Sequence, residues 1–258
     1  MSTGAITAHI DVAQVVLYAF WVFFAGLVYY LHRENKREGY PLESDSRGGR
    51  VVIQGFPAVP EAKTYRLANG QTRQAPGPNS ARQPLQGGVA TSPVPGSPIV
   101  PVGNPLLAGV GPGAYADRTD EPDTTIDGEP RIVPLRAAPG FSVAPQDGDQ
   151  IGLPVFGGDG KVGGKVVDLW VDRSEAIFRY IEIEVPTAGG PRRVLAPMTF
   201  AKVREFRVTV RSILGAQFAD VPGLRNPDQI TSREEDRISA YYAAGTLYAE
   251  ASRQEPFL

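Results

Sequence analysis

Cysteine is absent from the 258 residues, and histidine occurs only twice, at His9 and His32. The lack of thiols excludes disulfides, thiolate metal sites, iron–sulfur clusters and cysteine catalysis in this chain. The two histidines are 23 positions apart, which is about 35 Å along a helix, so they cannot share one metal ion. We therefore expect the chain to ligate no metal and no cofactor, and its sequence carries no nucleophile or metal signature of an enzyme.

A basic excess is also missing. The 26 basic residues are balanced by 28 acidic ones, which gives a formal net charge of -2 and a pI near 5.8. Nucleic-acid-binding domains normally carry clustered positive charge, so nucleic acid is not an expected partner. One region is locally basic and suits lipid headgroups or an acidic partner instead. It contains Arg192, Arg193, Lys202, Arg204, Arg207 and Arg211.

One long apolar run lies near the N-terminus. Residues 12–31 carry no charge, and Gln14 is their only amide. A helix of about 20 residues covers the roughly 30 Å of a bilayer's hydrocarbon core. The run therefore predicts a transmembrane helix over residues 12–31. A buried helix of a soluble domain is the alternative, and a cleaved signal sequence fits poorly because no Lys or Arg precedes the run.

The charges that flank this run predict its orientation. Only Asp11 precedes it, whereas Arg33, Lys36 and Arg37 follow closely. The positive-inside rule places the side that is rich in Lys and Arg in the cytoplasm. Residues 1–11 are thus predicted to be a periplasmic tail. Arg33, Lys36, Arg37 and Tyr40 are predicted to contact lipid headgroups.

Proline and glycine are concentrated in the middle of the chain. Residues 41–150 hold 17 of the 24 prolines. Proline lacks the amide donor and favours extended paths when it recurs every two or three residues. We expect residues 32–150 to be a juxtamembrane and extended surface segment, with disorder as the alternative. Short strands are predicted only at residues 51–56 and 64–67.

Alternating patterns begin near residue 151. Residues 166–172, 180–185, 194–198 and 206–210 are short β-branched or aromatic runs between Gly, Pro and Asp, which is typical of strands. Within residues 180–185, three aliphatic side chains share one face opposite Tyr180, Glu182 and Glu184, so a half-buried antiparallel sheet is predicted. The absence of crossover helices favours a small antiparallel barrel or sandwich over a parallel sheet.

A helix is predicted to close this domain, which spans residues 151–258. Ser232 and Glu235 have the spacing of a capping box. Ile238, Tyr241, Tyr242 and Gly245 follow at helical spacing. The predicted fold class is therefore a single transmembrane α-helix plus a mainly-β cytoplasmic domain with a C-terminal helix.

Gly158, Gly160 and Gly163 match a dinucleotide-binding pattern letter for letter. That fingerprint requires a helix directly after the glycines, whereas residues 166–172 are predicted to be a strand. Asp159-Gly160 between two apolar runs is instead typical of a hairpin turn. We interpret the motif as a turn.

Five carboxylates and one arginine crowd into 17 residues of the predicted sheet. One interpretation is a solvated face with weak surface ion pairs. The other is a proton relay, because crowded carboxylates raise one another's pKa and can then exchange protons near neutral pH. The residues are Asp168, Asp172, Glu175, Arg179, Glu182 and Glu184.

Five strings occur in a fixed order along nearly the whole chain. They are IDVAQVVLYAFWVFFAGLVYYL from residue 10, REGYPL from residue 37, GNPLLAGVGPGAYADR from residue 103, KVVDLWVDRSEAIFRYIEIEV from residue 165 and DQITSREEDRISAYYAAGTLYA from residue 228. Together they resemble the H subunit of the purple-bacterial photosynthetic reaction centre. REGYPL and LWVDRSE are the most specific strings, and residues 43–100 match least.

The resemblance implies one transmembrane helix and a cytoplasmic antiparallel barrel of the PRC type. It implies a non-catalytic subunit that caps the cytoplasmic face of the L and M subunits. Its expected location is the inner membrane, including the intracytoplasmic (chromatophore) membrane that carries the photosynthetic complexes. Those subunits would hold bacteriochlorophyll, bacteriopheophytin, quinones, a non-haem iron and carotenoid. Their H chain supports assembly, shields the quinones and assists proton delivery to the secondary quinone. A cytochrome subunit, the core light-harvesting antenna and membrane lipids are further expected partners.

The resemblance also implies site residues. Glu175 matches the family's buried proton-path glutamate, with Asp172 and Arg179 beside it. Asp127 falls where the family has an acidic residue near the point of proton uptake. Some members have histidines just after that aspartate, whereas this chain has Gly128 and Glu129 there. Glu129 is the expected substitute acceptor. A single-span membrane adaptor that uses a PRC-type barrel to bind other cytoplasmic partners is the alternative function.

Overall fold

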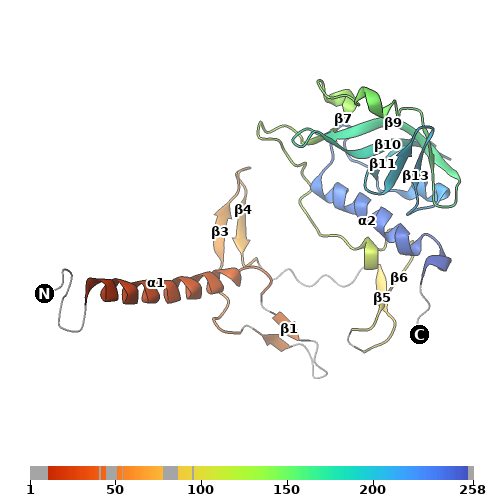
Figure 1. The fold of residues 1–258 in the computed structure, drawn as a ribbon. Helices are drawn as coiled ribbons and strands as arrows, with labels where there is room; N and C mark the ends of the chain where they lie inside the picture. The colour runs from red at the N-terminus through yellow and green to blue at the C-terminus, as the bar shows by residue number, and fades with distance from the viewer. Residues whose placement is uncertain are drawn as a thin grey trace. The chain divides into compact units, whose positions relative to one another are not determined.

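A computed structural model describes residues 11–40, 42–44, 51–53, 55–77, 87–94 and 96–254 (Figure 1). Two compact units share the chain: residues 1–84 with 94–96, and residues 85–93 with 97–258. The predicted order of elements is confirmed, since an apolar N-terminal helix long enough to cross a membrane is followed by a mainly-β domain with a C-terminal helix.

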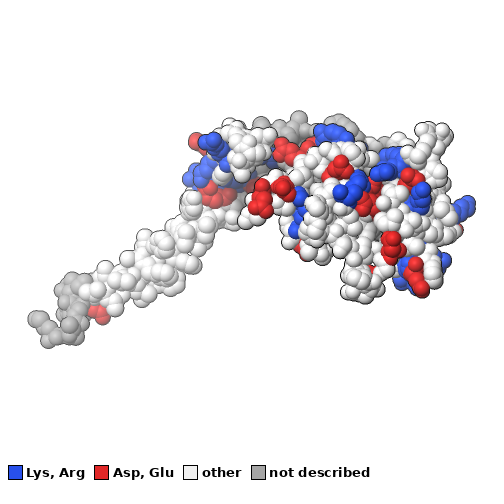
Figure 2. Space-filling view, turned by 90° about the horizontal axis from the view of Figure 1, so that it is seen from above, with Lys and Arg blue, Asp and Glu red and all other residues white. Residues whose placement is uncertain are grey.

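The first unit contains the apolar helix α1, Val12–Asn35. Asp11 caps its N-terminus by accepting a hydrogen bond from the Gln14 backbone N–H at 2.7 Å. None of its residues is buried, and Figure 2 shows uncharged side chains along its length. It is the one described helix long and apolar enough to cross a membrane. The helix begins where predicted and continues one turn beyond residue 31.

Short antiparallel ladders interrupt the proline-rich segment. Strand β1 (Leu42–Ser44) pairs with β2 (Val51–Ile53), and β3 (Lys63–Arg66) pairs with β4 (Thr72–Ala75). In the second unit β5 (Gly88–Ala90) pairs with β6 (Ile99–Pro101). The segment thus holds more regular structure than we predicted, because local turns close strands too short to show periodicity.

The β3–β4 turn shows how such a hairpin forms. Gly70 has a φ of +81°, and its N–H donates to the Leu67 carbonyl at 3.0 Å. The Asn69 side chain accepts from the Gln71 N–H at 3.0 Å. An Asn-Gly pair suits a tight turn because both residues tolerate conformations that others avoid.

The second unit is built on a seven-stranded sheet whose main path runs β11-β10-β9-β8-β13-β12, with β7 also paired to β9. All pairs are antiparallel except β8 with β13. Strands β11 and β12 lie at the two ends of this path and do not pair with each other, so the predicted barrel is not closed. The strands are β7 (Ile132–Pro134), β8 (Pro154–Phe156), β9 (Val162–Asp172), β10 (Ile177–Thr187), β11 (Gly190–Pro197), β12 (Ala201–Arg204) and β13 (Arg207–Val210). Strand β7 lies within residues 32–150, the stretch predicted to be extended.

The prediction of a half-buried sheet was wrong for β10. Ile181 and Ile183 are fully buried as expected, but Tyr180 and Glu182 on the opposite face are buried too. Two elements cover that second face: the short 3₁₀ helix η2 (Leu135–Ala137) and the C-terminal helix α2 (Ser232–Tyr248). Polar side chains at alternating positions therefore sit inside the domain.

Helix α2 lies against the sheet and completes the core (Figure 1). Its capping box is Thr231 with Glu234, one residue earlier than predicted, because the Ser232 hydroxyl donates to Asp123 instead. Ile238, Tyr241 and Tyr242 are buried as expected. A Cβ at Gly245 would lie 2.4 Å from the Ser212 carbonyl oxygen, so only glycine allows this close approach. Two further 3₁₀ helices flank the core, η4 (Gly215–Asp220) and η5 (Ala251–Arg253).

Candidate functional site

The turn between β9 and β10 is shaped by Asp172, whose side chain is fully buried. Its Oδ1 accepts hydrogen bonds from the backbone N–H groups of Ser174 at 3.0 Å and Glu175 at 3.1 Å. Ala176 follows with a φ of +54°. An aspartate that accepts from the next backbone amides is a standard way to tighten such a turn. The turn consequently holds Glu175 in a fixed place beside Asp172.

Two guanidinium groups lie between these carboxylates. Arg131 donates to Asp172 through Nε at 3.0 Å and forms an ion pair with Oδ2 at 2.7 Å, and it also contacts Glu175. Arg179 donates to Glu175 at 2.8 Å and to Asp172 at 3.3 Å. Arg131 reaches the turn because the next residue, Ile132, pairs with Asp172 in the β7–β9 ladder. The site is therefore an alternating cluster of two cations and two anions.

The pKa of Asp172 moves opposite to the direction that crowding predicts. Burial by itself opposes ionisation of this carboxyl, but the hydrogen bonds from Arg131 and from the Glu175 and Ser174 amides outweigh burial and lower its pKa. The partnership with Asp172 and Glu175 likewise raises the pKa of Arg131. Asp172 therefore stays ionised at neutral pH and fixes the guanidinium groups around it.

Glu175 is the accessible member of the cluster. Its side chain is 48% exposed, whereas Asp172 is fully enclosed. The resemblance implied a buried glutamate at this position. In this chain by itself, the buried carboxylate is Asp172 and not Glu175. Glu175 therefore contacts solvent while it is bound to Arg131 and Arg179.

Asp127 and Glu129 lie on an adjacent loop that folds back on itself. The Thr125 N–H donates to the Glu129 carbonyl at 2.8 Å. Arg173 joins this loop to the cluster: it donates to the Glu129 carboxylate at 2.6 Å and to the Pro130 carbonyl at 3.0 Å. Asp127, Glu129 and Ser174 line one hollow of about 450 Å³. The structure thus brings both predicted uptake residues next to the β9–β10 turn.

The six crowded residues of the sequence divide into three separate sets. Asp168 and Glu182 are opposite each other in the β9–β10 ladder and share the guanidinium of Arg136 at 2.8 and 2.6 Å. Glu182 also accepts from the Trp170 indole at 3.0 Å and has a side chain only 4% exposed. Glu184 instead pairs with Lys165 at 2.9 Å. The strand register therefore separates Asp168, Glu182 and Glu184 from the third set, which consists of Asp172, Glu175 and Arg179 at the β9–β10 turn.

Sequence reasoning missed the arginines that organise these sets. Arg131, Arg136 and Arg173 each contact carboxylates at least 30 positions away. Only a correct pairing of β7 with β9 would have indicated the Arg131 contact, and the short run Ile132–Pro134 gave no such signal.

A further titratable pair was also missed. The Tyr180 hydroxyl donates to Glu235 of α2 at 2.8 Å. Burial raises the pKa of Glu235, and the negative charge of Asp123 adds to that effect. The spacing of Ser232 and Glu235 predicted that Glu235 belongs to a capping box. In that position its side chain would have faced the helix end rather than β10.

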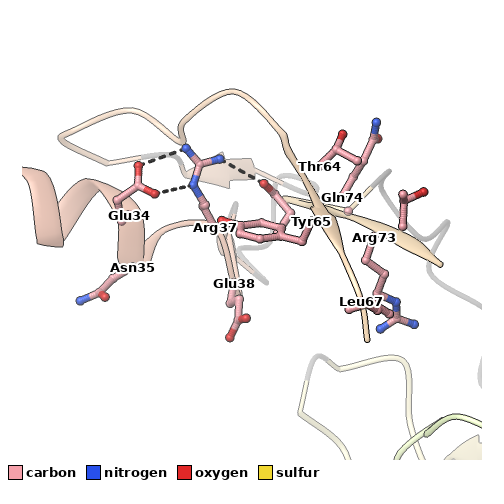
Figure 3. Close-up of a pocket in the computed structure, with 12 residues that line it drawn as sticks. Glu34, Asn35, Arg37, Glu38, Thr64, Tyr65, Leu67, Arg73 and Gln74 are labelled. Carbon is pink, nitrogen blue, oxygen red and sulfur yellow. Dashed lines mark hydrogen bonds and ion pairs between the residues drawn. The ribbon is translucent and has the colours of Figure 1, made fainter. Parts of the chain in front are cut away.

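In the first unit, the residues that follow α1 bind their own chain. Lys36 is buried, and its Nζ donates to the Pro57 carbonyl at 2.5 Å and lies 5.1 Å from the centre of the Tyr40 ring. Arg37 binds Glu34 at 2.8 and 3.1 Å and the Ala75 carbonyl at 3.1 Å (Figure 3). These two predicted headgroup contacts therefore anchor the β3–β4 hairpin and its approach to the helix end. Arg33 remains exposed.

Glu34 and Arg37 also line a hollow between the end of α1 and β3–β4 (Figure 3). Its volume is about 1230 Å³. Polar side chains from both elements line it, including Asn35, Thr64 and Gln74. Glu34, one of the lining residues, pairs with Lys63 at 2.7 Å. Hydrogen-bonding groups thus gather where the apolar helix ends.

Within the described residues, no group of three or more His, Asp and Glu side chains could hold a metal ion. Two family models match the chain. The first is described as the photosynthetic reaction centre, H-chain N-terminal region, and it matches residues 4–137. The second is the PRC-barrel domain, and it matches residues 147–217. The first match includes α1 and Arg131, and the second includes the β9–β10 turn.

Proposed function

Since this chain belongs to the photosynthetic reaction centre H-chain family, we propose that it supports light-driven electron transfer to quinone and assists proton delivery to the secondary quinone. The family is a structural subunit of the reaction centre and associates with the L and M subunits. The single apolar helix α1 agrees with a membrane-anchored subunit. In this proposal the pigments, quinones and iron are bound by the other subunits.

The observation that carries the proton role is the arrangement at the β9–β10 turn. Asp127 and Glu129 line a hollow with Ser174, the residue that precedes Glu175. Glu175 is half-exposed and held by two guanidinium groups. Protons taken up at the loop carboxylates would need to travel only a short distance to Glu175. Asp172 acts as a positioning residue because its ionised carboxylate holds both arginines in place.

We further propose that the C-terminal side faces the cytoplasm and residues 1–11 the periplasm. Arg33, Lys36 and Arg37 follow α1 and supply the positive charge of the cytoplasmic side. Arg33 is the exposed member of this group and the proposed headgroup contact, together with Tyr40. Lys36 and Arg37 contribute their charge while they hold the β3–β4 region.

The subunit assignment is tested by purification through an affinity tag on this chain. A complex that contains L and M subunits, absorbs in the near infrared and carries quinone is the expected result. A stoichiometric, colourless preparation that lacks quinone would favour the alternative, a single-span adaptor that uses its barrel to bind other cytoplasmic partners.

Replacing Asp127 with Asn and Glu129 with Gln together is expected to slow proton uptake on quinone reduction. The two changes remove both acceptors of the hollow but keep their shapes. Proton uptake can be followed with a pH-sensitive dye after a light flash. Unchanged uptake kinetics in the double variant would dismiss this point of uptake.

A further inference from the structure

The β12–β13 hairpin carries its cations on one face. Val203 and Val208 are opposite each other and pack toward the core, so the alternate positions point outward. The outward positions are Lys202 and Arg204 on β12 and Arg207 and Thr209 on β13, and Arg211 continues the alternation just after β13. All four cationic side chains are exposed.

None of these four cations has a partner in the described part of the chain. Elsewhere in the same unit, arginines such as Arg131, Arg136 and Arg173 are bound to carboxylates. Arg204 and Arg207 are even directly opposite each other in the ladder. Like charges in this position are unfavourable, so the fold gains nothing from this pair. An outside partner would explain its presence.

The tip of the hairpin is aromatic. Phe206 is 74% exposed and lies in the two-residue turn between Arg204 and Arg207. Glu205, its neighbour in the turn, is the only carboxylate there. An aromatic ring flanked by long cationic side chains is typical of groups that enter a membrane interface, because the ring lies at headgroup level and the cations reach phosphates.

We propose that the β12–β13 hairpin docks on anionic phospholipid headgroups of the membrane that α1 crosses. Four unpaired cations complement a negatively charged leaflet, and each Lys or Arg near such a surface is attracted to it. A protruding turn fits a deformable lipid surface better than a protein pocket. The inference rests on the proposed anchoring of the chain by α1.

The chain has no native cysteine, so a Phe206→Cys variant offers one site for a spin label. The labelled chain, in its complete complex, is placed in nanodiscs of phosphatidylcholine with or without phosphatidylglycerol, and the unmutated complex corrects for labelling of other subunits. We expect phosphatidylglycerol to lower collisions of the label with a water-soluble nickel chelate severalfold and to keep collisions with oxygen high. Adding Arg204→Gln and Arg207→Gln should abolish this protection.

Ala188→Cys is the matched control, because Ala188 is exposed at the β10–β11 turn and the nearby Arg192 is bound to the Ala219 and Val221 carbonyls. Its label should stay accessible to the chelate in both lipids. A label at position 206 that is equally accessible in both lipids would overturn the proposal. Equal protection in both would also overturn it, in favour of an acidic protein surface. A chain that does not enter nanodiscs would contradict the anchor itself.

Discussion

The Glu175→Gln variant is expected to slow the second, proton-coupled electron transfer to quinone by about a hundredfold, which is typical for the loss of one positioned proton-transfer group. Initial charge separation should keep its wild-type rate because it requires no proton. Glutamine keeps the volume of Glu175 and an acceptor for Arg131 and Arg179. It removes the ability to take up and release a proton, together with the negative charge of the carboxylate. Flash spectroscopy resolves the two steps.

Glu250→Gln is the matched control for this variant. The Glu250 side chain is 44% exposed and also pairs with an arginine, Arg253, at 2.9 Å. It precedes η5 and does not line the hollow of Asp127 and Glu129. Both electron-transfer steps should be normal in this control. If the second step were also normal in Glu175→Gln, the relay would be wrong, and the carboxylates of the turn would be a solvated face.

The Asp172→Asn variant is expected to lower the free energy of unfolding by about 3 kcal/mol, within the range for breaking a buried ion pair by removing one partner. The change leaves Arg131 and Arg179 without the buried anion that they share and with only the half-exposed Glu175 between them. It also weakens the acceptor that tightens the β9–β10 turn. For a domain of about 150 to 250 residues, this loss of unfolding free energy corresponds to a fall in melting temperature of roughly 6 to 12 °C. Near-UV circular dichroism of the full chain in detergent measures it.

The stability difference between wild type and Asp172→Asn should depend on pH. Because the folded protein lowers the pKa of Asp172, the stabilisation is fully present above the carboxyl's ordinary pKa near 4 and is lost as the pH falls below it. The difference should thus be constant near neutral pH and shrink under acid conditions. Asp149→Asn, at an exposed residue that accepts one backbone N–H, is the control and should lose little stability. A wild-type melting temperature in Asp172→Asn would contradict the positioning role.

Local patterns predicted the elements that local energetics decide. The uncharged run at residues 12–31 predicted α1. In a helix every backbone hydrogen bond is made within the segment, so an apolar helix surrounded by lipid needs no partner elsewhere in the chain. Alternation predicted β9, β10, β11 and β13, with ends that differ by a few residues. The helical spacing of Ile238, Tyr241 and Tyr242 predicted the buried face of α2. Each of these signals lies within a single segment.

Contacts between distant segments were not predictable in this way. Tyr180 and Glu182 look like solvent-facing residues by alternation, but Glu235 and Arg136 cover them from elements 46 and more positions away. The capping box moved by one residue because Ser232 bonds to Asp123 of a remote loop. In each case a partner from elsewhere in the chain competed with the local arrangement.

The sequence by itself determined an apolar N-terminal helix, a β-rich domain with a closing helix, and a set of carboxylates near Glu175. Only the tertiary structure decided which carboxylates share a site. The register of β9 against β10 assigns Asp168 and Glu182 to Arg136, and the pairing of β7 with β9 brings Arg131 to Asp172. The reason is physical: composition and spacing fix how many charges a segment carries, but the sign of a pKa shift depends on the distance to the opposite charge. That distance is set by chain segments that meet only on folding.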